Sequence, residues 1–256
     1  MDKPQFSPSS IATYNFCPHA FRLKNENDVK SEPSDAMKAG LLFEGYLLGF
    51  KGDSQKELEG RKFAKSLDKF KTQAEWLKPV FTEGSSFNWI EYESKYWNLR
   101  GEIDYYGFVD TEYLSELCGQ EIDAELSTAI VDIKYTGNVQ KMWDAKTERE
   151  SLLQSVCYPY MIWKTQGEKV PFFYLIVDSE FERPIVRVQQ VLYSDYDFQF
   201  IERLLNQCAN DIFYLPNISD DTCGGAKNYQ SRCRYAELCE FGRAFIGGYK
   251  EIVFNN

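Results

Sequence analysis

One stretch of the sequence decides the fold: Ala129-Ile130-Val131-Asp132-Ile133-Lys134-Tyr135. Its β-branched and aromatic content predicts a buried strand. Because side chains alternate along a strand, Asp132 and Lys134 share one face while Val131 and Ile133 share the other. By itself this spacing is also typical of an ordinary half-buried strand, so its meaning depends on the residues around it.

The segments on either side alternate between helical and strand patterns. Apolar residues at helical spacing predict helices over residues 11–23, 36–50, 55–77, 147–165 and 194–213. Aromatic and β-branched runs predict strands over residues 87–96, 99–109, 127–134, 171–177 and 185–193. This order predicts an α/β fold in which helices flank a central mixed β-sheet.

The composition fits a single domain. With 43% hydrophobic residues over 256 positions, the chain can bury a substantial core. We expect one domain over residues 1–256, with its core at about 36–215. The segments 7–24 and 216–245, which hold cysteine, arginine and tyrosine, predict a small additional lobe.

Charge and hydropathy limit the partners. A net charge of −10 argues against binding nucleic acid over the whole surface, so DNA would have to meet a local basic groove. Clustered carboxylates become neutral or positive once divalent cations fill them, which weakens this objection for a protein that binds such cations. The sequence has neither an apolar run of membrane-spanning length nor an N-terminal signal peptide, so we expect no membrane partner and a cytoplasmic location.

Seven cysteines are present. In a reducing compartment they are more naturally thiols or metal ligands than disulfides. Cys118, Cys157 and Cys208 stand singly in the sequence and are predicted to be small packing residues.

Two further acidic segments accompany the Asp132 strand. Gly101-Glu102-Ile103-Asp104 places a carboxylate on a preceding strand, and Glu44 lies on a predicted helix. Convergence of Glu44, Asp104 and Asp132 would create the oxygen-rich site that Mg²⁺ or Mn²⁺ prefers. An ammonium beside it would orient an attacking water and stabilise the negative charge that builds on a phosphoryl group, which is the role we expect for Lys134.

Gln154 and Tyr158 follow on a predicted helix. They are four residues apart and therefore lie on one helical face. Their amide and hydroxyl groups could hold a metal-bound water, a phosphate or a sugar. Each is also typical of a surface or capping residue.

In this order the motifs resemble the PD-(D/E)XK nuclease superfamily, in its RecB-like branch, which includes CRISPR adaptation nucleases and many phage exonucleases. That family carries a helical Gly-x-x-x-His/Glu, a Gly-x-Ile-Asp, an Asp/Glu-x-Lys and a Gln-x-x-x-Tyr. This chain has Gly40 to Glu44, Gly101 to Asp104, Asp132 to Lys134, and Gln154 to Tyr158. Glu44 departs from the histidine of many members, which favours a hard cation, and the proline of the second motif is absent.

The resemblance implies a restriction-endonuclease-like core and a Mg²⁺- or Mn²⁺-dependent deoxyribonuclease. Its activity would be that of an exonuclease on single-stranded DNA or duplex ends, in recombination, repair or phage DNA processing, with proteins of those processes as partners. Glu44, Asp104, Asp132 and the carbonyl of Ile133 would bind metal. Lys134 would position water, and Gln154 and Tyr158 would orient substrate.

The cysteine lobe resembles that of iron–sulfur members of the same branch. There one cysteine near the start, here Cys17, joins three near the end, here Cys223, Cys233 and Cys239. Cys223 lies ten positions before Cys233, whereas the family usually has two residues between them, so a [4Fe–4S] cluster, Zn²⁺ and free thiols all stay open. If the two ends meet, Arg22, Arg232 and Arg234 would form a basic rim that contacts DNA.

Two other classes remain as alternatives. A non-cleaving DNA-binding or scaffold subunit could keep the same fold, although the intact Asp-x-Lys argues against it. A glycoside hydrolase with a carboxylate pair is disfavoured by the lysine beside Asp132.

Overall fold

The computed structural model describes residues 3–18, 21, 34–51, 63, 65–137 and 145–214. The chain divides into two compact units. Unit 1 comprises Met1–Ser31, Glu93–Leu99 and Gln199–Asn256, and unit 2 comprises Glu32–Tyr92 and Arg100–Phe198. The prediction of one domain over 1–256 stays a prediction.

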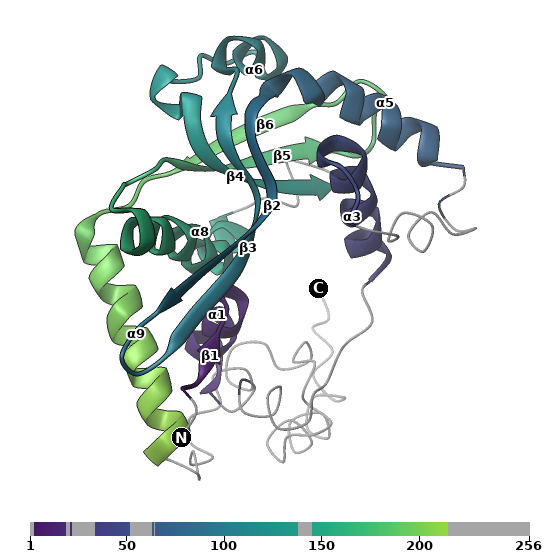
Figure 1. Ribbon diagram of the computed structural model, residues 1–256. Helices are drawn as coiled ribbons and strands as arrows, with labels where there is room; N and C mark the ends of the chain where they lie inside the picture. The colour runs from purple at the N-terminus through teal and green to yellow at the C-terminus, as the bar shows by residue number, and fades with distance from the viewer. Residues whose placement is uncertain are drawn as a thin grey trace, which may run out of the picture. The chain divides into compact units, whose positions relative to one another are not determined.

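The sheet is mixed, as predicted. Its strands are β1 (Gln5–Phe6), β2 (Phe81–Glu93), β3 (Asn98–Val109), β4 (Thr128–Thr136), β5 (Phe172–Asp178) and β6 (Val186–Val191). The strand order is β1-β3-β4-β5-β6, and β2 pairs with β3 (Figure 1). β4 and β5 are parallel, whereas β3 with β4 and β5 with β6 are antiparallel. With helices flanking this sheet, the predicted α/β class is confirmed, and the architecture is consistent with a restriction-endonuclease-like core.

The helices of unit 2 follow local sequence signals. They are α3 (Asp35–Leu48), α5 (Leu67–Leu77), α6 (Thr111–Cys118) and α8 (Ala145–Gln166), with short 3₁₀ turns η1 (Lys78–Val80) and η2 (Ala124–Ser127). The Ser34 side chain accepts the N–H of Met37 and caps α3, and the Asp110 side chain accepts the N–H of Tyr113 and caps α6. The final helix, α9 (Asp195–Tyr214), continues from unit 2 into unit 1. None of the described helices is long and apolar enough to cross a membrane.

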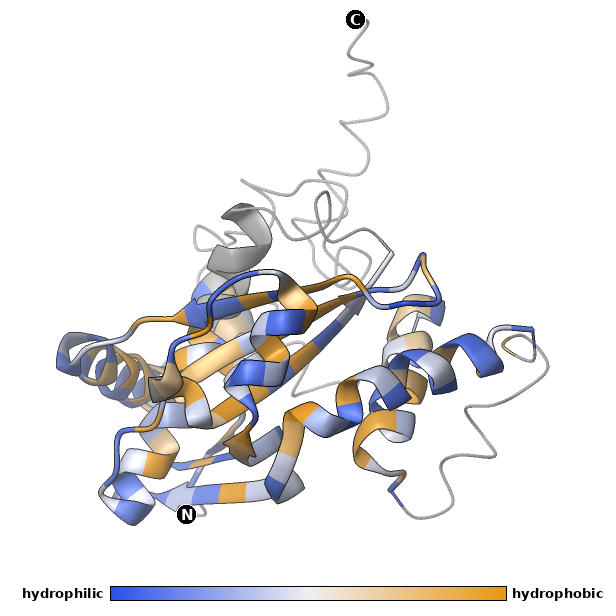
Figure 2. Ribbon diagram, turned by 90° about the horizontal axis from the view of Figure 1, so that it is seen from above, coloured by the Kyte–Doolittle hydropathy of each residue, from blue (hydrophilic) through white to orange (hydrophobic). Residues whose placement is uncertain are grey.

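The core of unit 2 lies between α3, α5 and the central strands. Phe43 and Leu47 of α3 and Leu77 of α5 belong to the same buried cluster as Val131 and Ile133 of β4. Every residue of β5 is buried, as expected for a strand covered on both faces. In Figure 2 the strands carry many hydrophobic residues, and the helices beside them alternate hydrophilic and hydrophobic residues.

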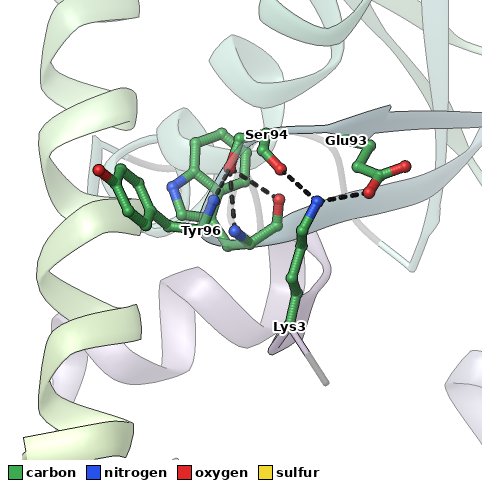
Figure 3. A network of polar contacts seen from close by, with 5 residues as sticks. Lys3, Glu93, Ser94 and Tyr96 are labelled. Carbon is green, nitrogen blue, oxygen red and sulfur yellow. Dashed lines mark hydrogen bonds and ion pairs between the residues drawn. The ribbon is translucent and has the colours of Figure 1, made fainter. Parts of the chain in front are cut away.

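The described part of unit 1 is built from α1 (Pro8–Phe16), β1, the tip of the β2–β3 hairpin and most of α9. Ser7 and Ser10 form a reciprocal capping box at the start of α1. The Lys3 ammonium donates to the Glu93 carboxylate at 2.5 Å and to the Ser94 carbonyl at 2.9 Å, and so ties the N-terminal segment to the hairpin (Figure 3). Nearby, the Tyr14 hydroxyl donates to Asp211 on α9.

Several predicted boundaries were wrong, each for a local reason. β2 begins at Phe81 rather than at residue 87. Its first residues were missed because they are mostly polar and exposed and give no alternating signal. The helix predicted over 11–23 is interrupted after Phe16, where Cys17 has an extended backbone. α6 was not predicted, since eight residues are too few for a clear helical period.

Gly107 of β3 provides a test of this packing. A Cβ at Gly107 would collide with backbone atoms of Glu83 and Gly84 on β2, which cannot move away as a flexible side chain could. We expect Gly107→Ala to lower the free energy of unfolding by about 1–3 kcal/mol. In urea titrations, Gly40→Ala is the control, because its Cβ would enter open space on a helix. Equal stabilities for the two variants would contradict the close approach of β2 and β3.

Candidate active site

The site begins where the ladder between β3 and β4 ends. Pairing runs from Phe108 opposite Thr128 to Tyr105 opposite Val131. The next step of the same register brings Asp104 opposite Asp132, and like charges in facing positions weaken strand pairing. The N–H of Ile133 donates instead to the Asp104 carboxylate at 2.9 Å. A side chain therefore takes over a backbone hydrogen bond at the point where two carboxylates meet.

Asp132 and Lys134 form an ion pair along β4. Asp132 is only 4% exposed, so an unpaired charge there would be costly. The Lys134 side chain is 30% exposed, and its ammonium lies 5.6 Å from the ring centroid of Tyr174 on β5. The lysine thus neutralises a buried carboxylate.

Core packing of α3 places Glu44 beside these residues. Phe43 stacks on Tyr135 of β4 with ring centroids 4.5 Å apart. The adjacent Glu44 carboxylate is thereby brought into the electrostatic field of Asp104 and Asp132.

Burial and mutual repulsion shift the proton affinities of two of these acids. Burial, and then the negative charge of Asp104, raise the pKa of Glu44 to about 8. Burial, and then the charge of Asp132, raise the pKa of Asp104 to about 7. Both shifts show that the cluster disfavours additional negative charge.

Lys134 responds in the opposite sense. Burial alone lowers the pKa of its ammonium, but the charges of Asp132, Asp104 and Glu44 together outweigh burial and raise this pKa above its ordinary value. Lys134 therefore remains a cation across the physiological range. This charge state suits stabilisation of a phosphoryl group rather than general-base chemistry.

The predicted pair on α8 lies in the same neighbourhood. The Gln154 amide is 3.5 Å from the Tyr158 hydroxyl, and Tyr158 is buried with its ring stacked near Phe172. Burial, and to a lesser degree the charges of Asp132 and Asp104, raise the pKa of Tyr158. Tyr158 therefore stays a neutral hydroxyl, and it can donate a hydrogen bond toward the carboxylate cluster.

The donor set fits a hard cation. Among the described residues, no three His, Cys, Asp or Glu side chains are gathered into a ready-made metal cage. Glu44, Asp104 and Asp132 nevertheless interact electrostatically, and all three offer oxygen ligands. Mg²⁺ usually retains several waters and uses only one or two carboxylates, so a closed cage is not needed.

Lys51 is a further member of this cluster and was not predicted from the sequence. Its ammonium pairs with Glu102, and its positive charge partly offsets the rise in the pKa of both Glu44 and Asp104. Lys51 lies seven residues after Glu44, a spacing that returns to the same helical face, although α3 ends before it is reached. That spacing is the only sequence signal that could have suggested Lys51.

Most of the cysteine and arginine predictions cannot be placed. Cys223, Cys233, Cys239, Arg22, Arg232 and Arg234 lie outside the described residues. Among those described, Cys17, Cys157 and Cys208 are buried, and burial raises the pKa of Cys118 to about 11. Raised thiol pKa values indicate packing rather than reactive roles for Cys118, Cys157 and Cys208.

Two solved structures and one family model are similar to this chain. A solved structure named "Putative exonuclease", from Eubacterium rectale, superimposes with a TM-score of 0.52 at 17% identity, over 81% of this chain and 79% of that one. The solved structure of SSO0001 gives a TM-score of 0.44 at 9% identity, over 94% of this chain and 87% of that one. No significant match was found among curated proteins. The family model described as the PD-(D/E)XK nuclease superfamily matches residues 5–240, so the chain belongs to this superfamily.

Proposed function

We propose that this chain is a Mg²⁺- or Mn²⁺-dependent deoxyribonuclease, acting as an exonuclease in DNA recombination, repair or phage DNA processing. One observation carries the proposal: the Asp132–Lys134 ion pair lies beside Asp104 and Glu44, whose pKa values are both raised. Carboxylates with an adjacent ammonium are the groups that metal-assisted phosphodiester hydrolysis requires. Membership of a nuclease superfamily supports the same reaction.

Each residue has a distinct role in this proposal. Glu44, Asp104, Asp132 and the carbonyl of Ile133 would hold the cation, which when bound supplies Lewis acidity and an activated water. Lys134 orients the attacking water and stabilises the negative charge that develops on the phosphoryl oxygens. Gln154 and Tyr158 orient the substrate by hydrogen bonding, for which their placement on α8 is suited.

The type of cleavage and the partners form a further part of the proposal. Exonuclease action on DNA is favoured by the resemblance to the RecB-like branch and by the name of the E. rectale neighbour. The RecB-like motif order also favours partners from recombination or phage DNA processing.

Replacement of Lys134 tests the reaction directly. We expect Lys134→Ala to reduce cleavage at least about a hundredfold, the usual loss when one transition-state-stabilising group is removed. DNA binding should persist, and the folded fraction is checked by circular dichroism because the change leaves the buried Asp132 without its cation. The measurement follows end-labelled single- and double-stranded DNA with Mg²⁺, Mn²⁺ or EDTA.

Lys169→Ala is the matched control, because Lys169 forms an exposed ion pair with Asp195 at 2.6 Å. It should cleave like the unchanged protein. Retained cleavage by Lys134→Ala would rule out the assigned role, and DNA binding without cleavage by the unchanged protein would point to a scaffold subunit.

The carboxylate cluster predicts an unusual dependence of stability on pH. In the folded protein the pKa of Glu44 rises from 4.5 to about 8 and that of Asp104 from 3.8 to about 7. At pH values below the pKa values of the unfolded chain, the folded and the unfolded protein both bind these protons. Between the unfolded and folded values only the folded state does, so the free energy of unfolding falls as pH rises. The metal-free protein should therefore lose stability from about pH 4 to pH 8.

Thermal unfolding in EDTA at a series of pH values checks this expectation. Glu44→Gln should flatten the loss of stability, whereas Glu121→Gln, in an exposed loop, should leave it unchanged. Added Mg²⁺ should stabilise the protein more at pH 8 than at pH 5, because cation ligands must be deprotonated. Stability that rises between pH 5 and pH 8 in EDTA would be incompatible with the cluster.

The cysteine lobe is proposed to hold a [4Fe–4S] cluster, with Zn²⁺ as the alternative ion. Anaerobically purified protein should then absorb in the iron–sulfur region and contain iron by metal analysis. Cys233→Ser should remove the metal, whereas Cys118→Ser should retain it because Cys118 stands apart in the sequence. Folded protein that is colourless and free of metal would refute both proposals.

A further inference from the structure

One face of β3 leads away from the catalytic carboxylates. Arg100, Glu102 and Asp104 occupy alternate positions on this strand, and the intervening Gly101 and Ile103 are buried. Alternation places the first three on one side of the strand. Arg100 lies about 13 Å from Asp104 along the strand, given the rise of a β-strand.

A cation is fixed beside the middle of this face. The Lys51 ammonium pairs with Glu102 and also lies 4.1 Å from the ring centroid of Phe87 on β2. Phe87 is the one described non-glycine residue with a positive φ, of 52°. Such a backbone conformation is unfavourable for a large side chain, and strained residues of this kind cluster at active sites and ligand clamps.

An exposed aromatic ring lies beside Arg100, at the end of this face farthest from Asp104. Trp89 of β2 is 64% exposed, although tryptophan is a residue that folded proteins normally cover. The Arg100 guanidinium carbon lies 5.9 Å from its ring centroid. An Arg–Trp pair of this kind holds the indole in place and leaves aromatic surface available to a ligand.

We propose that the Lys51–Phe87–Trp89–Arg100 face is a binding track for a single-stranded segment of the DNA substrate, leading to the carboxylate cluster. The inference rests on the proposed nuclease function and extends it to the form of the substrate. Lys51 contacts a phosphate next to the one being cleaved, and Trp89 stacks on a base. Stacking requires an unpaired base, which favours a single strand over an intact duplex.

Glu102 regulates this track through competition for Lys51. In the free protein its carboxylate occupies the ammonium that a phosphate would otherwise meet. DNA must therefore displace Glu102 from Lys51. It follows that removal of the two charges has opposite effects: loss of Lys51 weakens binding, and loss of the Glu102 charge strengthens binding.

Fluorescence anisotropy with a labelled oligo(dT) of about 12 nucleotides, within the range of single-strand site sizes, tests the track. EDTA prevents metal-dependent cleavage of the probe, so binding is measured whether or not the protein is a nuclease. Trp89→Ala should weaken binding about fivefold to a hundredfold, and Trp89→Phe should restore part of the loss. Lys51→Met should weaken binding and reduce the salt slope by about one, whereas Glu102→Gln should tighten binding.

Trp76→Ala is the matched control, because Trp76 on α5 is 41% exposed and also lies beside an arginine, Arg183, at 5.3 Å. Its affinity for oligo(dT) should be unchanged. Equal losses for Trp76→Ala and Trp89→Ala, shifts in the same direction for Lys51→Met and Glu102→Gln, or an equal effect of Trp89→Ala on blunt duplex would each overturn the track. Cleavage of the same oligonucleotide by the unchanged protein in Mg²⁺ is assayed separately. Its absence, with the binding pattern intact, would overturn only the nuclease proposal.

Discussion

The repulsion between Asp104 and Asp132 is the constraint on which the site depends. Their register brings two carboxylates to facing positions on neighbouring strands, and Asp132 is almost fully buried. Such an arrangement survives only if other groups compensate the charge. Lys134 does so for Asp132, and the N–H of Ile133 does so for Asp104. The groups that compensate these two charges are therefore also the groups that determine the chemistry of the site.

The hydrophobic core holds this electrostatic cluster in place from behind. The buried Gln73 of α5 accepts a hydrogen bond from the Tyr135 hydroxyl at 2.7 Å and donates to the Asp178 carbonyl at 2.9 Å. Tyr135 in turn stacks on Phe43, the neighbour of Glu44. One continuous set of contacts thus connects α5, β4, β5 and α3. Because protein interiors are closely packed, the position of Glu44 relative to β4 is set by side chains that take no part in the chemistry.

Sequence patterns predicted the parts of the site that depend on local geometry. Alternation along the strand placed Asp132 and Lys134 on one face, and helical spacing placed Gln154 with Tyr158. Lys51 and Phe87 could not be found in this way, because their contacts join the end of a helix to a strand with an irregular backbone. Nor did the polar first half of β2 carry a strand signal, since its pairing with β3 depends on glycines that permit close approach. Long-range contacts of this kind have no periodic signature.

The charge balance of the cluster bears on the order in which ligands bind. Among the described residues, the carboxylates of Glu44, Asp104, Asp132 and Glu102 interact with the ammonium groups of Lys51 and Lys134, so acidic groups outnumber basic ones at the site within an acidic protein. A polyanion is repelled by such a site unless protons or cations neutralise it first. The raised pKa values of Glu44 and Asp104 show that protons already do so in part near neutral pH. A divalent cation would displace these protons and offset the two excess negative charges of the site, and so the metal must precede or accompany the phosphate that it helps to cleave.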